Sequence, residues 1–354
     1  MENQAPQKKF IPWADLIRIV AAYLVVMIHV SGQITNIWGQ VPNGDWFIAN
    51  IYGGVARISV ALFFMISGYL LLPRSESLAD FYRKRMPKVL IPFIAWSLIY
   101  LGWYCRNHPG TCTPSVIQNL LFVQGAAYHL WFLYYLLGIY LILPLLRLMI
   151  QPNTDRQVLW YFIGLWLIFQ PGLLMAKQFW GFKVNLSAPM ATGFTGFFIL
   201  GYLLGGWTLS RRTIILSAIG LFLGSLGTIL GTYLMTRNAG QFDGFFYDLV
   251  SLPVIVAAAG AFILLRWISE AKVFASPKAH DLLRLLASTT FGIYLVHVLI
   301  IEILRGWIPG FRLDSFIGNP LWSIPLVSAV VFVVSFLIVR VLQRIPLLNH
   351  IVPG

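Results

Sequence analysis

The stretch RIVAAYLVVMIH, residues 18–29, places a guanidinium and an imidazole at the two ends of an apolar segment. Ten uncharged residues separate Arg18 from His29. At a helical rise of about 1.5 Å per residue, they lie ~16 Å apart, roughly half the hydrocarbon thickness of a bilayer. At about 100° per residue, both side chains return to one helix face. We therefore expect a membrane helix with Arg18 near one boundary and His29 deep inside.

The composition places the whole chain in a membrane. Of 354 residues, 58% are hydrophobic and 10% are charged, and the mean hydropathy is +0.78. A soluble domain is about half apolar and about a quarter charged, so this class is excluded. The first residues, MENQAPQKKF, are polar, and no small-residue cleavage site follows the first apolar run. We therefore expect the first helix to remain in the mature protein.

Membrane spans follow from a requirement of about 20 apolar residues per crossing. The sequence predicts ten, at 10–33, 51–73, 87–106, 128–149, 157–175, 191–209, 213–235, 247–267, 285–306 and 321–343. The longest connections, 33–50, 106–127 and 306–320, are expected to be polar loops, and Gln170-Pro171-Gly172 marks a break in the fifth span. The expected fold is an all-α polytopic membrane protein of about ten transmembrane helices, with residues 1–354 forming a single domain.

The orientation follows from the basic residues, which concentrate in cytoplasmic loops. With the N-terminus inside, only seven of the 25 basic residues fall outside or in the outer leaflet: Arg57, Arg106, Lys177, Lys183, Arg237, Arg305 and Arg312. Both termini are therefore expected in the cytoplasm. The same asymmetry explains most of the net charge of +13, so nucleic-acid binding is not needed to account for it.

Ionisable residues inside spans are costly and tend to mark functional sites. Arg57 lies at a depth similar to His29, and either positions an anionic acceptor, holds a partner of the histidine or pairs with Glu302. His129 lies near the outer boundary and fits an interfacial aromatic belt equally well. His297 lies deeper in its span. Glu302 follows it by five residues, about 140° around the helix, so the two do not share a face.

Three further residues have local expectations. Asp15 precedes Arg18 by three residues and can pair with it on one helix face. Cys105 and Cys112 fall at or after the outer end of the third span, where either a disulfide or two free thiols is possible. A CxxC spacing is absent and no metal is expected.

These motifs together resemble the acyltransferase-3 family of multi-span membrane acyltransferases. The resemblance rests on Arg18 and His29 with ten residues between them, FFMISGY at 63–69, the basic segment leading to Pro92, HLWFLYYL at 129–136 and FGIYLVH at 291–297. The motifs span most of the chain and occur in the family's order.

The resemblance implies transfer of an acetyl group from cytoplasmic acetyl-CoA to a hydroxyl of a surface or periplasmic polysaccharide, or its lipid-linked precursor. It implies a bacterial inner-membrane enzyme whose partners are acetyl-CoA, a glycan or glycolipid and the lipid bilayer. The implied residues are Arg18 and His29 for catalysis, Arg18, Arg83, Arg85 and Lys88 for the cofactor, and Arg57, His129, His297 and Glu302 on the acceptor side.

One motif departs from the family. The basic motif commonly has two arginines separated by two residues, whereas here it is Arg85-Met-Pro-Lys88. Lysine keeps the charge but lacks the bidentate fork that suits phosphate. We therefore expect Arg83 or Arg85 to carry more of the phosphate recognition than Lys88.

His29 has two mechanistic alternatives. As a neutral imidazole it is a general base for the acceptor hydroxyl, which is the favoured route. It can instead form an acetyl-histidine intermediate. Ser67 is expected to be a small packing residue.

Two rival functions remain. A proton-coupled transporter of a small anion would suit the buried histidines, but such folds usually pair broken helices in inverted repeats, and the Gln170 break has no partner. A non-catalytic partner in glycan assembly would need no inner basic cluster.

Overall fold

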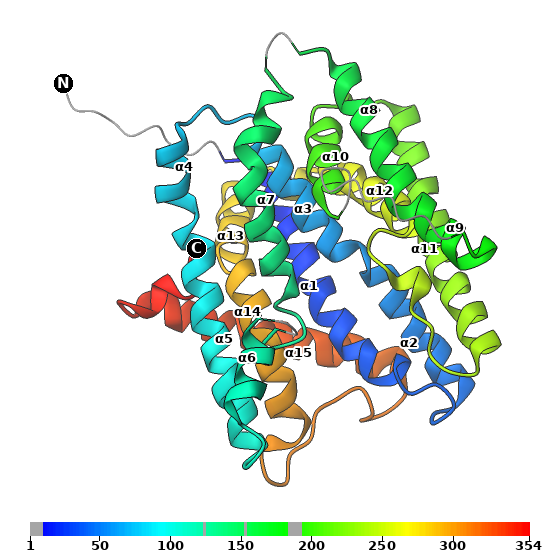
Figure 1. Cartoon of the computed structure of the whole chain (residues 1–354), viewed down its shortest axis with the longest axis vertical. Helices are drawn as coiled ribbons and strands as arrows, with labels where there is room; N and C mark the ends of the chain where they lie inside the picture. Colours follow the sequence, from blue (N-terminus) through cyan, green and yellow to red (C-terminus); the bar gives the residue numbers. More distant parts are fainter. Residues whose placement is uncertain (1–9, 123–124, 152–153, 183–192) are drawn as a thin grey trace.

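The computed structural model describes residues 10–122, 125–151, 154–182 and 193–354, and within them the chain is helical without strands (Figure 1). The α-helices of the first half are α1 Pro12–Thr35, α2 Asn43–Ala56, α3 Ile58–Leu71, α4 Leu78–Arg85, α5 Pro87–Asn107, α6 Pro114–Phe122, α7 Trp131–Leu148, α8 Arg156–Leu167 and α9 Leu173–Trp180. Those of the second half are α10 Thr195–Gly205, α11 Arg211–Ala239, α12 Leu252–Ile268, α13 Pro277–Ala287, α14 Thr290–Glu302 and α15 Pro320–Arg344. The short helices are η1 Ile168–Gly172, η3 Phe245–Tyr247, η4 Lys272–Phe274, η5 Ile303–Trp307 and η6 Leu348–His350.

The all-α membrane fold expected from the sequence is confirmed. Nine helical segments of the described residues are long and apolar enough to cross a membrane. The sixth expected span, 191–209, is represented by α10, which has 11 residues and is shorter than a bilayer crossing requires. The first part of that expected span, residues 191–192, lies outside the described residues.

Three features differ from the expected spans. The loop expected at 33–50 is shorter, because α2 already begins at Asn43. The second span is divided at Arg57, the residue between α2 and α3. The break expected at Gln170-Pro171-Gly172 is a π-helical turn, η1, through which the helix continues. Proline removes a backbone donor, and this turn accommodates the loss without ending the helix.

Helix α1 occupies the interior of the bundle (Figure 1). It begins with Pro12, whose missing N–H is tolerated in a first helical turn. It contacts α2, α3, α12, α13, α14 and α15. Ile17, Ala21 and Val26 on it are fully buried. Arg18 and His29 lie on this helix at positions of intermediate burial, where neighbouring helices decide their surroundings.

Helices α3 and α10 cross at very close range. A Cβ on Gly68 would lie 1.8 Å from the carbonyl oxygen of Phe198, and one on Gly201 would lie 2.0 Å from that of Met65. Small residues allow such backbone contact between membrane helices. Gly68 of the SGY motif is thus a packing residue, and Ser67 beside it donates to the Phe63 carbonyl at 2.7 Å.

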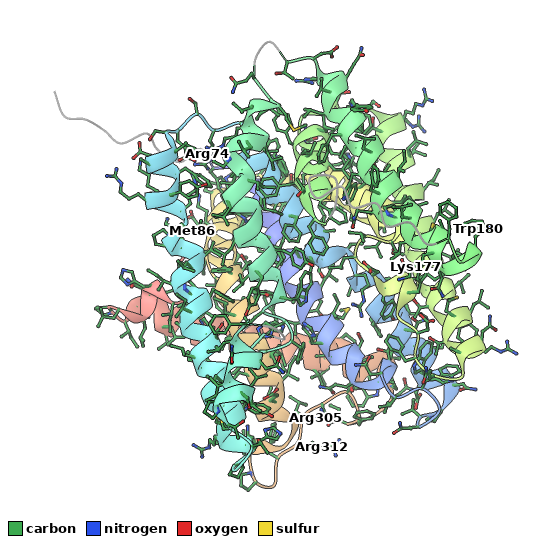
Figure 2. All side chains as sticks on the ribbon, in the orientation of Figure 1. Arg74, Met86, Lys177, Trp180, Arg305 and Arg312 are labelled. Atoms are coloured by element: carbon green, nitrogen blue, oxygen red, sulfur yellow. A yellow bond between two sulfur atoms is a disulfide. The ribbon has the colours of Figure 1, made fainter. Side chains whose placement is uncertain are left out.

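Labelled arginines mark the two ends of the bundle (Figure 2). Arg74 lies at the end formed by α4, whereas Arg305 and Arg312 lie at the opposite end.

Cys105 and Cys112, for which the sequence allowed either a disulfide or two free thiols, are joined in a disulfide.

Candidate active site

A cavity of about 520 Å³ opens at the α4 end of the bundle. This volume is within the range of small-molecule sites. Four basic residues contribute to its lining: Arg18, Arg74, Lys88 and Arg284. Its deeper wall is apolar, with Phe63, Ile66, Phe132, Leu136 and Tyr294 among the lining residues. A long ligand with an anionic head and a thin, less polar arm matches this division.

Arg18 lines the cavity and pairs with a carboxylate on its own helix. The expected pair with Asp15 is confirmed, with 3.2 Å between Nη1 and Oδ1. The Arg18 side chain is nevertheless 38% exposed, so the pair leaves part of it accessible to the cavity that it lines. The ion pair fixes the guanidinium without covering it.

The structure separates the other expected cofactor residues. Lys88 lines the cavity beside Arg18, whereas Arg83 and Arg85 do not. Arg83 pairs with Asp80 at 2.8 Å and its side chain is 78% exposed. Arg85 pairs with Glu76 at 3.1 Å. The assignment of cofactor contacts to Arg83 and Arg85 stays a prediction.

Glu76 is shared by two arginines. It accepts from Arg85 at 3.1 Å and from Arg147 at 2.9 Å, and its side chain is 14% exposed. Burial alone would raise the pKa of Glu76, but the hydrogen bonds and charges of Arg85 and Arg147 outweigh burial and lower that pKa below its usual value. This network links the segment before α4 to α7.

Three histidines from distant parts of the chain meet in the bundle. The His29 ring on α1 lies 5.1 Å from the His297 ring on α14 and 6.4 Å from the His129 ring, which precedes α7. His129 and His297 are themselves 5.1 Å apart. His297 is 0% exposed and His129 is 2% exposed. Tyr128 covers another side of His29, with ring centroids 5.0 Å apart.

The tautomer of neutral His297 follows from its neighbours. Its Nδ1 lies 2.7 Å from the carbonyl oxygen of Tyr294 and 3.2 Å from that of Ile293. A carbonyl can only accept, so Nδ1 carries the proton and Nε2 carries the lone pair. That Nε2 is buried and has no hydrogen-bond partner among the described residues. It is an acceptor beside His29, which itself makes no hydrogen bond within the described part of the chain.

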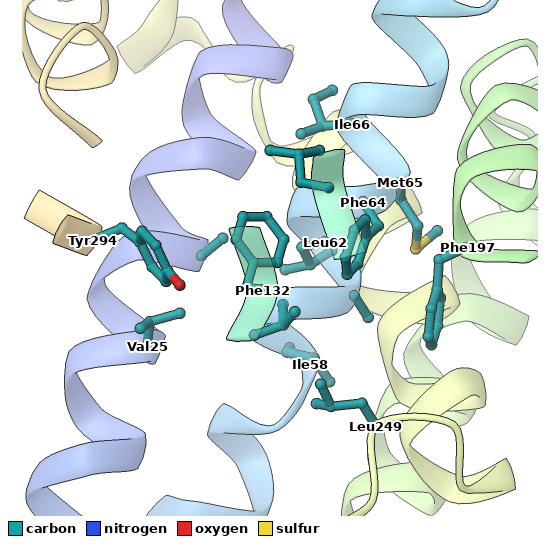
Figure 3. Packing of buried hydrophobic residues seen from close by; sticks show 14 of the residues in the cluster. Val25, Ile58, Leu62, Phe64, Met65, Ile66, Phe132, Phe197, Leu249 and Tyr294 are labelled. Atoms are coloured by element: carbon teal, nitrogen blue, oxygen red, sulfur yellow. The ribbon is translucent and has the colours of Figure 1, made fainter. Parts of the chain in front are cut away.

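Tyr294 joins the cavity to the histidines. It lines the cavity, and its hydroxyl donates to the backbone carbonyl of His129. Its ring lies 5.3 Å from Phe132 and 6.1 Å from His297. Figure 3 shows Tyr294 pointing from α14 toward Val25 and Phe132. The apolar end of the cavity therefore reaches the wall of the histidine cluster.

The remaining acceptor-side candidates are not paired with each other. Glu302 accepts from the indole N–H of Trp103, and Arg57 and Glu302 form no ion pair among the described residues, so the expected alternative of an Arg57–Glu302 pair is wrong. Arg57 instead lies over the Tyr247 ring, with its central carbon 4.1 Å from the ring centroid.

Sequence reasoning missed three residues of the site. Arg74 and Arg284 line the cavity, although both belong to segments that the positive-inside pattern explains without a ligand. Tyr294 lies within the FGIYLVH motif, but its contact with His129 joins residues 165 positions apart. A contact of that kind has no local sequence signal.

A family model described as an acyltransferase domain matches residues 11–340. The chain belongs to the acyltransferase-3 family. Proteins of this family are multi-pass membrane acyltransferases, and the match covers most of this chain. No group of three or more His, Cys, Asp or Glu able to hold a metal occurs among the described residues.

Two relatives that match part of the chain are named as racemases and not as acyltransferases. One is a serine/alanine racemase from Enterococcus gallinarum, 28% identical over 163 residues, and another is an amino-acid racemase from Enterococcus faecalis, 31% identical over 128 residues. The alignments cover 44% and 34% of this chain, but only 22% and 16% of the two racemases. No solved structure matches the chain.

Proposed function

We propose that this acyltransferase moves an acetyl group from acetyl-CoA to a hydroxyl of a surface or periplasmic polysaccharide, or of its lipid-linked precursor. The observation that carries the proposal is the basic cavity whose apolar end reaches the histidine cluster through Tyr294. The motifs also resemble those of the enterobacterial-common-antigen O-acetyltransferase. Racemisation is not proposed, because the aligned part is less than a quarter of either racemase.

The donor would enter with its phosphates at the basic end. Arg18, Arg74, Lys88 and Arg284 would bind the phosphates of coenzyme A, because guanidinium and ammonium groups form strong charge-assisted hydrogen bonds with phosphate. The pantetheine arm would follow the apolar wall toward Tyr294. The basic end would face the cytoplasm of a bacterial inner membrane, where positive residues concentrate.

The reaction would occur at His29. The acceptor hydroxyl attacks the thioester carbonyl carbon while His29 takes its proton. His297 presents an unprotonated Nε2 beside His29 and would orient that ring during proton transfer. An acetyl-histidine intermediate remains the alternative, and it would reach the same products in two steps.

A transfer assay with purified protein tests the proposal. The probes are acetyl-CoA labelled in the acetyl group and envelope polysaccharide stripped of its esters by mild base. We expect base-labile label on the polysaccharide, and a loss of about 10³-fold in His29→Ala, within the usual range for acid–base groups. Binding of acetyl-CoA, measured by calorimetry, should persist in that variant.

Two outcomes would contradict the proposal. Wild-type protein that does not bind acetyl-CoA would refute the donor, and full transfer by His29→Ala would refute the base. Uptake of free acetate by proteoliposomes, retained without any ester product, would favour the transporter instead.

A further inference from the structure

Arg57 carries a charge that has no ion-pair partner among the described residues, although Asp248 lies close enough to interact with it electrostatically. Its Nε is buried without a partner, and the guanidinium makes no hydrogen bond or ion pair with any described residue. Its central guanidinium carbon lies over the face of the Tyr247 ring, 4.1 Å from the ring centroid. Ionised groups inside a membrane protein are normally paired, because an isolated charge is costly there.

The ring beneath Arg57 is fixed by its own hydrogen bonds. The Tyr247 hydroxyl donates to Oδ1 of Asn50 at 2.7 Å and lies 3.1 Å from the Asn50 carbonyl oxygen. Asn50 in turn donates through Nδ2 to the Ile229 carbonyl at 2.9 Å. Asn50 is 0% exposed. The network ties α2 to α11 and η3, so the platform that supports the guanidinium is rigid.

Arg57 lies close to the level of His29. A Cβ on Gly53 would lie 3.3 Å from Oγ of Ser31, so α2 meets α1 just beyond His29. Arg57 follows Gly53 by four residues, about 6 Å along the antiparallel helix axis. The two residues are therefore within about one helical turn in depth. They are also close enough to interact electrostatically.

A fixed cation that makes no ion pair or hydrogen bond is suited to charge that appears only during a reaction. A group already paired in the resting state would have to break that pair first, whereas Arg57 has its donors free. Acyl transfer creates such a charge on the carbonyl oxygen of the thioester. We propose that Arg57 is a catalytic residue that pairs with this oxyanion, an inference that rests on the proposed thioester chemistry at His29.

The step balances as follows. The acceptor oxygen bonds to the carbonyl carbon, its proton passes to His29, and the carbonyl π electrons move to oxygen, where Arg57 pairs with them. The oxyanion then reforms the carbonyl and breaks the carbon–sulfur bond. The leaving thiolate takes the proton from His29, which gives the acetyl ester and free coenzyme A.

A pair of unreactive donor analogues tests this role by binding alone. Carboxymethyl-CoA carries a carboxylate near the position of the thioester carbonyl, and carbamoylmethyl-CoA is its neutral isostere. We expect Arg57→Gln to weaken carboxymethyl-CoA about 30-fold while changing carbamoylmethyl-CoA less than about threefold, because the lost bond is charge-assisted. Acetyl transfer should fall about 10²-fold in kcat with the donor KM unchanged.

Control variants separate this role from folding. Arg57→Lys keeps the charge and should retain most of the preference for the carboxylate. Arg106, which lies 5.0 Å from the Trp307 ring centroid, is a matched cation–π arginine, and Arg106→Gln should change neither analogue. Thermal melting of each variant in detergent reports its folding.

The outcomes are distinct. Wild-type protein that binds neither analogue would remove the proposed acetyl-CoA donor. Wild-type binding of both, with the same two affinities in Arg57→Gln, would overturn the oxyanion role alone. A variant that changes only the acceptor KM would also overturn it, and would assign Arg57 to acceptor recognition.

Discussion

The basic end of the cavity and the histidine cluster hold their polar groups in opposite ways. At the basic end, Arg18 keeps a 38% exposed side chain and a carboxylate partner, Asp15. In the cluster, His297 is completely buried and its Nε2 has no partner among the described residues. At the basic end, the loss of one cation leaves other cations in place. The histidine cluster instead depends on single atoms in fixed positions.

The contrast follows from what each region would bind. Phosphates are permanent charges that several flexible cations can hold, so losing one cation weakens binding by a limited factor. A proton or an electron pair moves between defined atoms, so losing one group stops a step. Variants should therefore change the donor KM at the basic end and kcat at the histidines.

Of the three variants that test this contrast, His297→Gln is expected to have the largest effect. Replacement by Gln removes the fixed Nε2 acceptor beside His29, and should lower kcat about 10²-fold with the donor KM unchanged. Steady-state transfer kinetics measure both values. His108, exposed and bonded to the Tyr104 carbonyl at 3.1 Å, provides the control His108→Gln, which should keep wild-type kinetics. An unchanged kcat in His297→Gln would contradict the expectation that variants at the histidines lower kcat.

A smaller effect is expected at Arg18. Arg18→Gln should raise the donor KM about tenfold, the loss of roughly one charge-assisted hydrogen bond. The increase should shrink in high salt, because exposed charges are screened. Arg83→Gln is the comparison variant. If it raises the donor KM as much as Arg18→Gln does, the phosphates extend beyond the cavity to Arg83, which the sequence favoured for phosphate recognition.

The smallest effect concerns stability at Glu76. Its pKa is lowered in the folded protein, so its ionised form contributes stability above its unfolded pKa. That contribution is lost as the pH falls through the lower, folded pKa. Glu76→Gln should destabilise the protein by about 1 kcal/mol at neutral pH, since each partly exposed pair contributes little. Melting curves of wild type and variant should converge in acid, and a gap that persists there would contradict this.

Much of the fold could be predicted from local sequence. The apolar runs located the helices, because a bilayer crossing needs a defined length of apolar residues. The Asp15–Arg18 pair followed from helical spacing. The division of the second span at Arg57 was missed, because the residues around it are as apolar as a continuous span.

The candidate site was only half predictable. Arg18, Lys88 and the three histidines were all named from motifs. Their grouping was not, because His29 and His297 are 268 positions apart and only helix packing sets their ring distance of 5.1 Å.

The sequence by itself determined that this protein lies in a membrane and that Arg18 and His29 share one helix face half a bilayer apart. Those properties depend on composition and helical period, which are local. The tertiary structure decided which cations face the cavity, that Glu76 pairs with Arg85, and that Arg57 makes no ion pair among the described residues. Such properties depend on which side chains meet across helices, and packing alone brings them together.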